Sequence, residues 1–112
     1  MSLIYSNQLG RMGEPIIRFV SIVSGASAME DKAFAPNPMN IRIGDTVTWK
    51  NTDVETHTVT YGSSASGSEN VSEFDSGLID PGQSFEHKFG KAGRYRYSCM
   101  IHPSMNGEII VE

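Results

Sequence analysis

The strongest constraint on the fold of this chain is a series of short segments in which apolar and polar residues alternate. In segment 94–99 the alternate positions are Tyr95, Tyr97 and Cys99, and polar residues fill the positions between them. A period of two residues is typical of a β-strand with one buried face. Segment 84–89 repeats the pattern, turns rich in Gly or Pro separate the segments, and no 3.6-residue period is visible. The chain is therefore predicted to be an all-β sandwich or barrel.

Further predicted strands have the β-branched and aromatic composition of sheets. In segment 46–51, Val47 and Trp49 are expected to share one face. Residues 1–13 are polar and are predicted to be a flexible N-terminal arm, followed by a single domain over residues 14–112. The Gly- and Ser-rich stretch 62–69 is predicted to be an exposed loop. The complete set of expected strands is 16–23, 41–43, 46–51, 57–61, 84–89, 94–99 and 108–111.

Charge and cysteine content exclude several classes of protein. The formal net charge of -4 argues against nucleic acid as a partner, because such proteins present a basic surface. No apolar run reaches membrane-spanning length, so no span is expected in this chain. The single cysteine cannot form an internal disulfide, but it is compatible with a metal site outside the cytoplasm. Residues 1–13 do not form a signal peptide, and we expect that one has been removed.

A metal-binding motif lies near the C-terminus. Cys99, His102 and Met105 follow one another with two residues between each pair, and His57 lies upstream. Thiolate and thioether suit Cu(I), and imidazole serves both oxidation states, so the set favours a mononuclear blue-copper site. Structural zinc is the rival interpretation, but it prefers several thiolates in paired spacing, and this chain has one.

Three blocks of sequence resemble the cupredoxins, and the plastocyanin and amicyanin group in particular. They are residues 44–49 continuing to His57, residues 74–83, and residues 92–99 continuing to Met105, within a likeness that runs from about 34 to 111. The resemblance implies a Greek-key β-sandwich with one copper per chain. It also implies that His57, Cys99 and His102 are equatorial ligands and Met105 the weak axial ligand.

The same resemblance implies a function and a location. Single electrons would pass between redox protein partners that dock weakly, and the chain would be a monomer in the periplasm or elsewhere outside the cytoplasm. Docking is expected around the edge of His102, at Ile101, Pro103 and Ser104. Small interfaces are typical of such transient encounters.

Asn51 and Thr58 are candidates for hydrogen bonds near the Cys99 sulfur or near residues 99–105, which we call the ligand loop. Hydrogen bonds at such positions tune the properties of a bound metal. The alternative is that both are ordinary polar residues of turns and strands. His87, between Phe85 and Phe89, is expected to be a partly buried strand residue rather than a ligand, because the ligand set is complete without it.

Two other functions remain open. A copper redox enzyme could act on a small molecule such as nitric oxide through an open coordination position. Ser104 favours this hypothesis, because amicyanin-like proteins carry a bulky aromatic residue there. A copper carrier or buffer is the other alternative, although a buried ligand set should release copper slowly.

Overall fold

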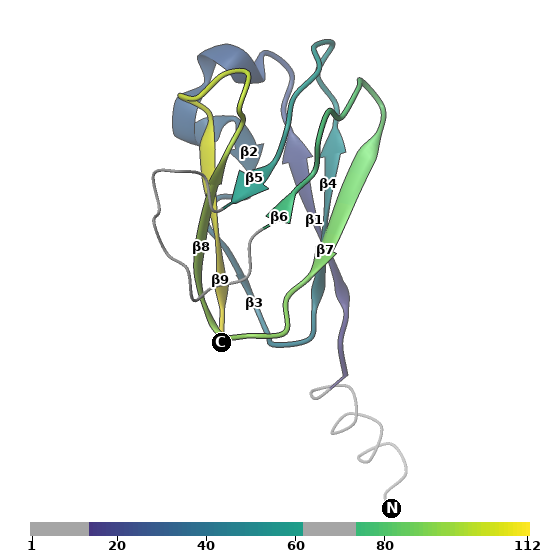
Figure 1. Cartoon of the computed structure of the whole chain (residues 1–112), viewed down its shortest axis with the longest axis vertical. Coiled ribbons are helices and arrows are strands. Elements are labelled where there is room, and N and C mark those ends of the chain that lie inside the picture. The colour runs from purple at the N-terminus through teal and green to yellow at the C-terminus, as the bar shows by residue number, and fades with distance from the viewer. Residues whose placement is uncertain (1–13, 62–73) are drawn as a thin grey trace, which may run out of the picture.

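A computed structural model describes residues 14–61 and 74–112 of the chain, and these ranges form two β-sheets packed face to face (Figure 1). One sheet has the strand order β2-β1-β4-β7, and the other has the order β3-β9-β8-β5-β6. Both sheets mix parallel and antiparallel pairs: β1 runs parallel to β4 and β3 parallel to β9, while β8 and β9 are antiparallel. The bounds are β1 Ile17–Ile22, β2 Phe34–Ala35, β3 Met39–Ile41, β4 Thr46–Asn51, β5 Thr60–Tyr61, β6 Phe74–Asp75, β7 Ser84–Lys88, β8 Gly93–Ser98 and β9 Asn106–Val111.

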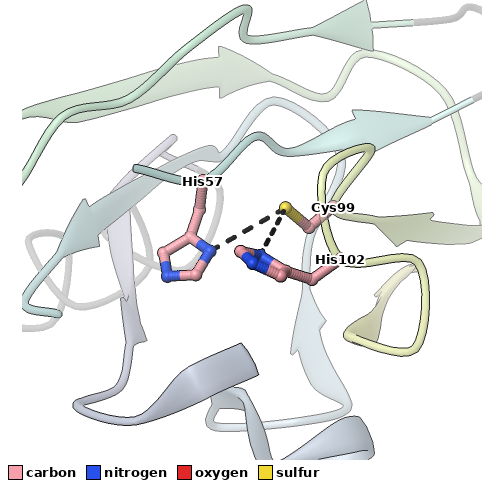
Figure 2. A group of neighbouring side chains, drawn as sticks. All are labelled: His57, Cys99 and His102. Carbon is pink, nitrogen blue, oxygen red and sulfur yellow. Dashed lines mark hydrogen bonds between the residues drawn. The ribbon is translucent and has the colours of Figure 1, made fainter. Parts of the chain in front are cut away.

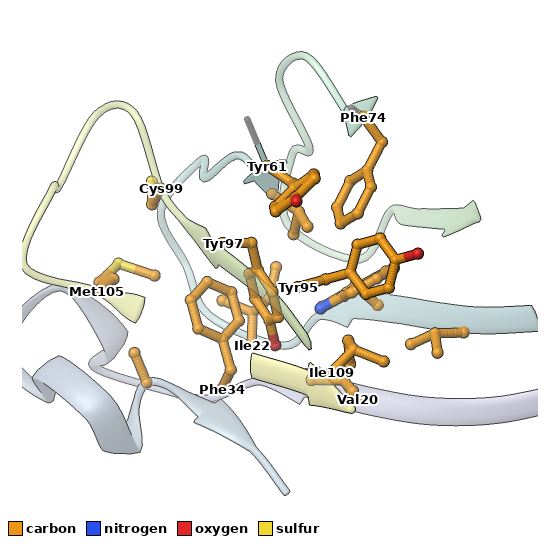
Figure 3. Packing of buried hydrophobic residues seen from close by; sticks show 14 of the residues in the cluster. Val20, Ile22, Phe34, Tyr61, Phe74, Tyr95, Tyr97, Cys99, Met105 and Ile109 are labelled. Atoms are coloured by element: carbon orange, nitrogen blue, oxygen red, sulfur yellow. The ribbon is translucent and has the colours of Figure 1, made fainter. Parts of the chain in front are cut away.

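The core lies between the two sheets and is rich in aromatic rings (Figure 3). Trp49 of β4 is fully buried, and its ring meets that of Tyr97 of β8 edge to face at 5.4 Å. The Phe34 ring of β2 also packs against that of Tyr97, with centroids 4.8 Å apart. Truncating a core aromatic typically costs about 3–5 kcal/mol, so these contacts hold the two sheets in a fixed relation.

Alternation predicted the buried faces correctly. Val47 and Trp49 of β4 are both buried, as are Tyr95, Tyr97 and Cys99 along and just beyond β8. The prediction of an all-β sandwich is therefore confirmed, and the sandwich rather than the barrel is the architecture. None of the helices within the described ranges has the length and apolarity needed to cross a bilayer.

Several element boundaries differ from those expected. The strand expected at 57–61 is reduced to β5, and His57 makes only an isolated bridge to Ile79. The strand expected at 41–43 lies two residues earlier, as β3. Two 3-10 helices, η1 Ala26–Ala28 and η2 Glu30–Lys32, were not predicted. The expected arm at 1–13 and the expected loop at 62–69 lie outside the described residues.

One end of the sandwich gathers segments that are distant in the sequence. The connection from β4 to β5, the loop from β8 to β9, and the two 3-10 helices all lie at the end opposite the C-terminus (Figure 1). Backbone hydrogen bonds hold the first of these connections in place: His57 and Ile79 exchange both of theirs, at 3.1 and 2.8 Å. The rigid core thus positions two loops against each other.

Candidate metal centre

Three of the predicted ligands meet at this end of the sandwich (Figure 2). The Nδ1 atom of His57 lies 3.8 Å from the Cys99 sulfur, and the Nδ1 atom of His102 lies 3.9 Å from the same sulfur. One donor atom from each residue lies within 4.8 Å of the other two. His57 and Cys99 are fully buried, and His102 is partly exposed.

These separations fit a single metal ion. For a first-row ion such as zinc, a bond of about 2.3 Å to sulfur and one of about 2.0 Å to nitrogen, meeting near 120°, would place the two donors about 3.7 Å apart. Both sulfur-to-nitrogen separations here lie close to that value. The mixture of one thiolate with two imidazoles matches copper better than a structural zinc site.

Met105 lies at the far end of the same loop and is fully buried. Two backbone hydrogen bonds close the loop: the Cys99 N–H donates to the carbonyl of Met105 at 3.2 Å, and the Met105 N–H donates to that of His102 at 2.9 Å. Figure 3 shows the thioether of Met105 on the core side of the loop that begins at Cys99. The short spacing of the motif is therefore compatible with a compact, hydrogen-bonded turn.

Thr58 links the two loops. Its backbone N–H donates to the Cys99 sulfur at 3.3 Å, and its hydroxyl accepts the N–H of Met100 at 2.8 Å. A donor to a thiolate stabilises the charged form and withdraws electron density from it. Thr58 thus makes both kinds of contact expected of it, although the bond to sulfur comes from the backbone and not from the side chain.

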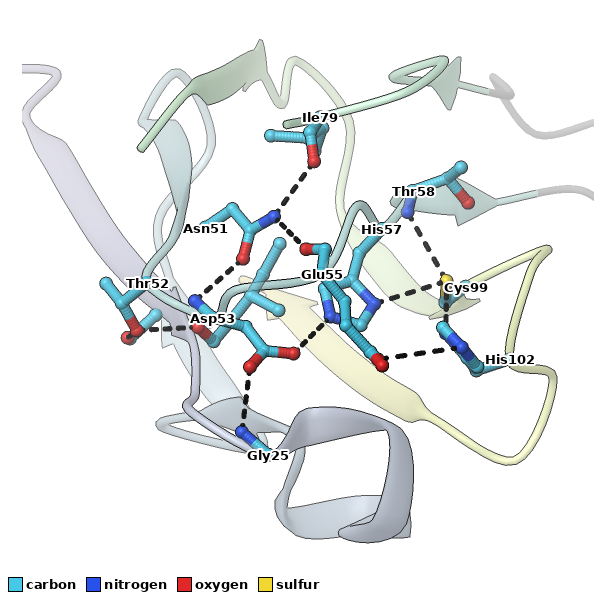
Figure 4. Close-up of polar contacts among 12 residues, drawn as sticks. Gly25, Asn51, Thr52, Asp53, Glu55, His57, Thr58, Ile79, Cys99 and His102 are labelled. Carbon is cyan, nitrogen blue, oxygen red and sulfur yellow. Dashed lines mark hydrogen bonds and ion pairs between the residues drawn. The ribbon is translucent and has the colours of Figure 1, made fainter. Parts of the chain in front are cut away.

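Asn51 has a different role from the one expected. Its side-chain N–H₂ donates to the carbonyls of Glu55 and Ile79, at 2.7 and 2.9 Å, and its Oδ1 accepts the N–H of Asp53 at 2.9 Å (Figure 4). These bonds shape the connection that delivers His57. Among the described residues, its side-chain bonds thus join that connection to Ile79, and none of them reaches the Cys99 sulfur or the ligand loop.

Asp53 is a site residue that sequence reasoning missed. Its Oδ2 lies 2.7 Å from the Nε2 atom of His57, and both side chains are buried. Burial opposes ionisation of Asp53, but the hydrogen bonds from His57, Gly25 and Val54 outweigh it and hold the pKa of the carboxyl below its ordinary value of 3.8. A carboxylate four residues before a ligand histidine was the only signal in the sequence.

The outer surface of the site is formed by the ligand loop. Ile101, Pro103 and Ser104, at which docking is expected, are exposed, and the His102 side chain is 29% exposed. Glu55 lies beside that ring, with Oε1 3.8 Å from the His102 Nε2 atom. The partly exposed ring of His102 thus lies between exposed Ile101 and Pro103 in the chain and near one carboxylate.

His87 is not among the three clustered donors. Its ring packs on Phe74 at a centroid separation of 4.6 Å and against Phe89 at 4.8 Å. Desolvation lowers the pKa of this imidazole below its ordinary value of 6.5. The expectation of a partly buried strand residue is confirmed.

Comparison with known proteins identifies the family to which these features belong. The model of the copper binding proteins of the plastocyanin/azurin family matches residues 21–112. Amicyanin from Paracoccus denitrificans is 31% identical over 74 residues, which cover 66% of this chain and 54% of that protein. Plastocyanin from Scenedesmus fuscus is 35% identical over 85 residues, covering 70% of this chain and 86% of that protein.

Solved structures agree with the sequence matches. The structure described as a novel purple cupredoxin from Nitrosopumilus maritimus superposes with a TM-score of 0.73 and 28% identity, over 85% of this chain and 99% of that one. In sequence, this chain matches only 54–64% of the length of three amicyanins, from Paracoccus denitrificans, Methylorubrum extorquens and Paracoccus versutus.

Proposed function

Because this chain belongs to the plastocyanin/azurin family of copper-binding proteins, we propose that it carries single electrons between redox proteins. The observation that carries the proposal is the convergence of His57, Cys99 and His102 within 4.8 Å at one end of a rigid sandwich. Bound copper would supply a one-electron couple between Cu(I) and Cu(II).

The chain's own residues would perform three tasks. His57, Cys99 and His102 would provide the strong ligands of the copper, and Met105 would provide a weak one. The Thr58 N–H fixes the direction of the sulfur at 3.3 Å. Two hydrogen-bonded loops on one core hold these groups, and ligand positions that changed little between the oxidation states of a bound copper would favour rapid electron transfer.

The partly exposed ring of His102 is the proposed route for the electron. A partner that docks on Ile101, Pro103 and Ser104 would approach this ring edge directly, and a small interface of this kind is typical of transient redox encounters. We propose accordingly that residues 14–112 act as one domain, as a monomer, in the periplasm or another compartment outside the cytoplasm.

Burial of Met105 supports the carrier over the enzyme alternative. An enzyme acting on a small molecule would need an open coordination position, and the Met105 side chain at the end of the ligand loop is fully buried rather than turned out to solvent. The carrier hypothesis requires such a closed site.

The proposal is tested by the visible spectrum of the protein after one equivalent of Cu(II), followed by reduction and reoxidation. We expect an intense thiolate-to-copper colour that disappears with one electron per chain and returns on oxidation. Cys99→Ala should abolish the colour, while His87→Gln, which changes a histidine outside the cluster, should leave it unchanged. A wild-type protein that stays colourless would contradict the proposed function.

A further inference from the structure

A buried contact joins Asp53 to His57, and the proposed ligand set does not use it. The Oδ2 atom of Asp53 lies 2.7 Å from Nε2, on the side of the ring away from Cys99, while Nδ1 lies 3.8 Å from the Cys99 sulfur (Figure 4). The two side chains are 2% and 0% exposed. Burying a carboxylate is costly unless it is paired, so this pair must be held in place by its surroundings.

Two further contacts hold Asp53, one through its carboxylate and one through its backbone. Its Oδ1 accepts the N–H of Gly25 at 2.9 Å, from the turn that leads into η1. The Asp53 N–H donates to Oδ1 of Asn51 at 2.9 Å, at the end of β4. Segments from both sides of the site thus fix Asp53, and through it they fix the ring of His57.

The orientation of the ring dictates its protonation pattern. An imidazole binds a metal through a nitrogen that bears no proton, so a ligand acting through Nδ1 must carry its proton on Nε2. That proton points at Oδ2 of Asp53 at hydrogen-bond distance. A carboxylate on the outer nitrogen raises the basicity of the inner one, and its buried negative charge favours the more positive oxidation state of the metal.

We propose that Asp53 is a positioning residue that fixes His57 in the Nε2–H tautomer and lowers the reduction potential of the copper site. The effect on the reduction potential rests on the proposed function, whereas the tautomer assignment does not. Glu55 has a weaker influence on His102, because it is 3.8 Å away and its side chain is 52% exposed, where solvent screens its charge.

The effect of Asp53 on the reduction potential is tested by comparing the potentials of copper-loaded variants. Asp53→Asn keeps a hydrogen-bond acceptor but removes the charge, and it should raise the potential by at least a tenfold change in the redox equilibrium, about 59 mV for one electron. The matched control is Asp45→Asn, which removes a buried, hydrogen-bonded carboxylate at the opposite end of β4 and should leave the potential unchanged. Glu55→Gln should give a smaller rise than Asp53→Asn.

The tautomer of His57 is tested in the metal-free protein. Nitrogen-15 chemical shifts of the His57 ring in the metal-free wild type should show a proton on Nε2, and in Asp53→Leu that preference should be lost. A bare Nε2 in the wild type would overturn the tautomer assignment, and this readout needs neither a folded variant nor copper. It therefore remains decisive even if the protein binds no coloured copper and the proposed function fails.

Two results with the loaded protein would overturn the electrostatic role. One is a coloured Asp53→Asn variant whose potential equals that of the wild type, which leaves the proposed function intact. The other is a wild type that binds two metal ions per chain and an Asp53→Asn variant that binds one. Asp53 would then be a ligand, in the second group of clustered donors formed by Asp53, Glu55 and His57.

Discussion

At the scale of single residues, the stability of the sandwich depends on how closely β8 and β9 approach each other. Gly107 of β9 is paired with Tyr97 of β8, and the phenol ring of Tyr97 covers the glycine. A Cβ atom at position 107 would overlap the hydroxyl and Cζ atoms of that ring. The ring cannot move aside, because Phe34 and Trp49 pack against it at 4.8 and 5.4 Å.

Gly107→Ala should therefore destabilise the fold by about 1–3 kcal/mol, the usual cost of forcing extra volume into a packed core. Urea unfolding of the metal-free protein measures the change in the free energy of unfolding. Gly90→Ala is the matched control, because a Cβ atom there would meet nothing within 4 Å. Equal stability of the two variants would show that the contact between Tyr97 and Gly107 is looser than described.

From the sequence, the site could be predicted only for residues whose type and spacing indicate metal binding. Cys99, His102 and Met105 are recognisable because thiolate, imidazole and thioether donors recur on one short loop. Asp53 could not be recognised, because aspartates are frequent in turns and this one becomes significant only when the fold buries it 2.7 Å from His57. A hydrogen bond between a proposed ligand and a buried carboxylate depends on tertiary structure rather than on a local sequence pattern.

At the scale of elements, length decided which parts of the fold were predictable. Strands β4, β7 and β8 are five or six residues long, enough for alternation to be visible. Strands β5 and β6 are two residues each, and η1 and η2 are three, so each contains a single period and no repeat that a sequence pattern could show. Their conformations follow from contacts made elsewhere, as when Gly25 donates to Asp53 ahead of η1.

The start of β4 depends on one buried carboxylate, that of Asp45. It accepts the N–H of Ile16 at 2.9 Å and the N–H of Arg42 at 3.0 Å, and Arg18 lies 3.6 Å away. Burial works against ionisation, but the two backbone bonds and then Arg18 outweigh it and hold the pKa of Asp45 below its ordinary value of 3.8. The ionised carboxylate thus ties the start of β1 to the turn before β4.

Asp45→Asn should lower the free energy of unfolding by about 1–3 kcal/mol at neutral pH, because hydrogen bonds to a charged acceptor are lost. A carboxyl with a lowered folded-state pKa contributes its full stabilisation above its unfolded value of 3.8, and the contribution is lost as the pH falls through the folded value. The difference between the wild type and Asp45→Asn should therefore shrink below about pH 4. A difference independent of pH in urea titrations at pH 7 and pH 3 would exclude this electrostatic origin.

At the scale of the whole molecule, the proposed ligands come from two distant parts of the chain. His57 is delivered by the connection after β4, while Cys99, His102 and Met105 belong to the loop before the last strand. Backbone hydrogen bonds from His57 to Ile79 already link this connection to the segment before β7. A bound metal would add a bond between the first half of the chain and its C-terminal hairpin, β8 and β9.

Copper should therefore raise the melting temperature, since a ligand that binds only the folded state stabilises it by mass action. At a free copper concentration about a thousand times the dissociation constant, the gain is about 4 kcal/mol, which corresponds to roughly 10 °C or more for a domain of this size. Calorimetry of the metal-free and copper-loaded protein measures the shift. Cys99→Ser is the control, because loss of the thiolate removes the strongest link between the two halves and should remove most of the shift. Equal melting temperatures of the two wild-type forms would mean that the site adds no cross-link to a fold that its core already holds.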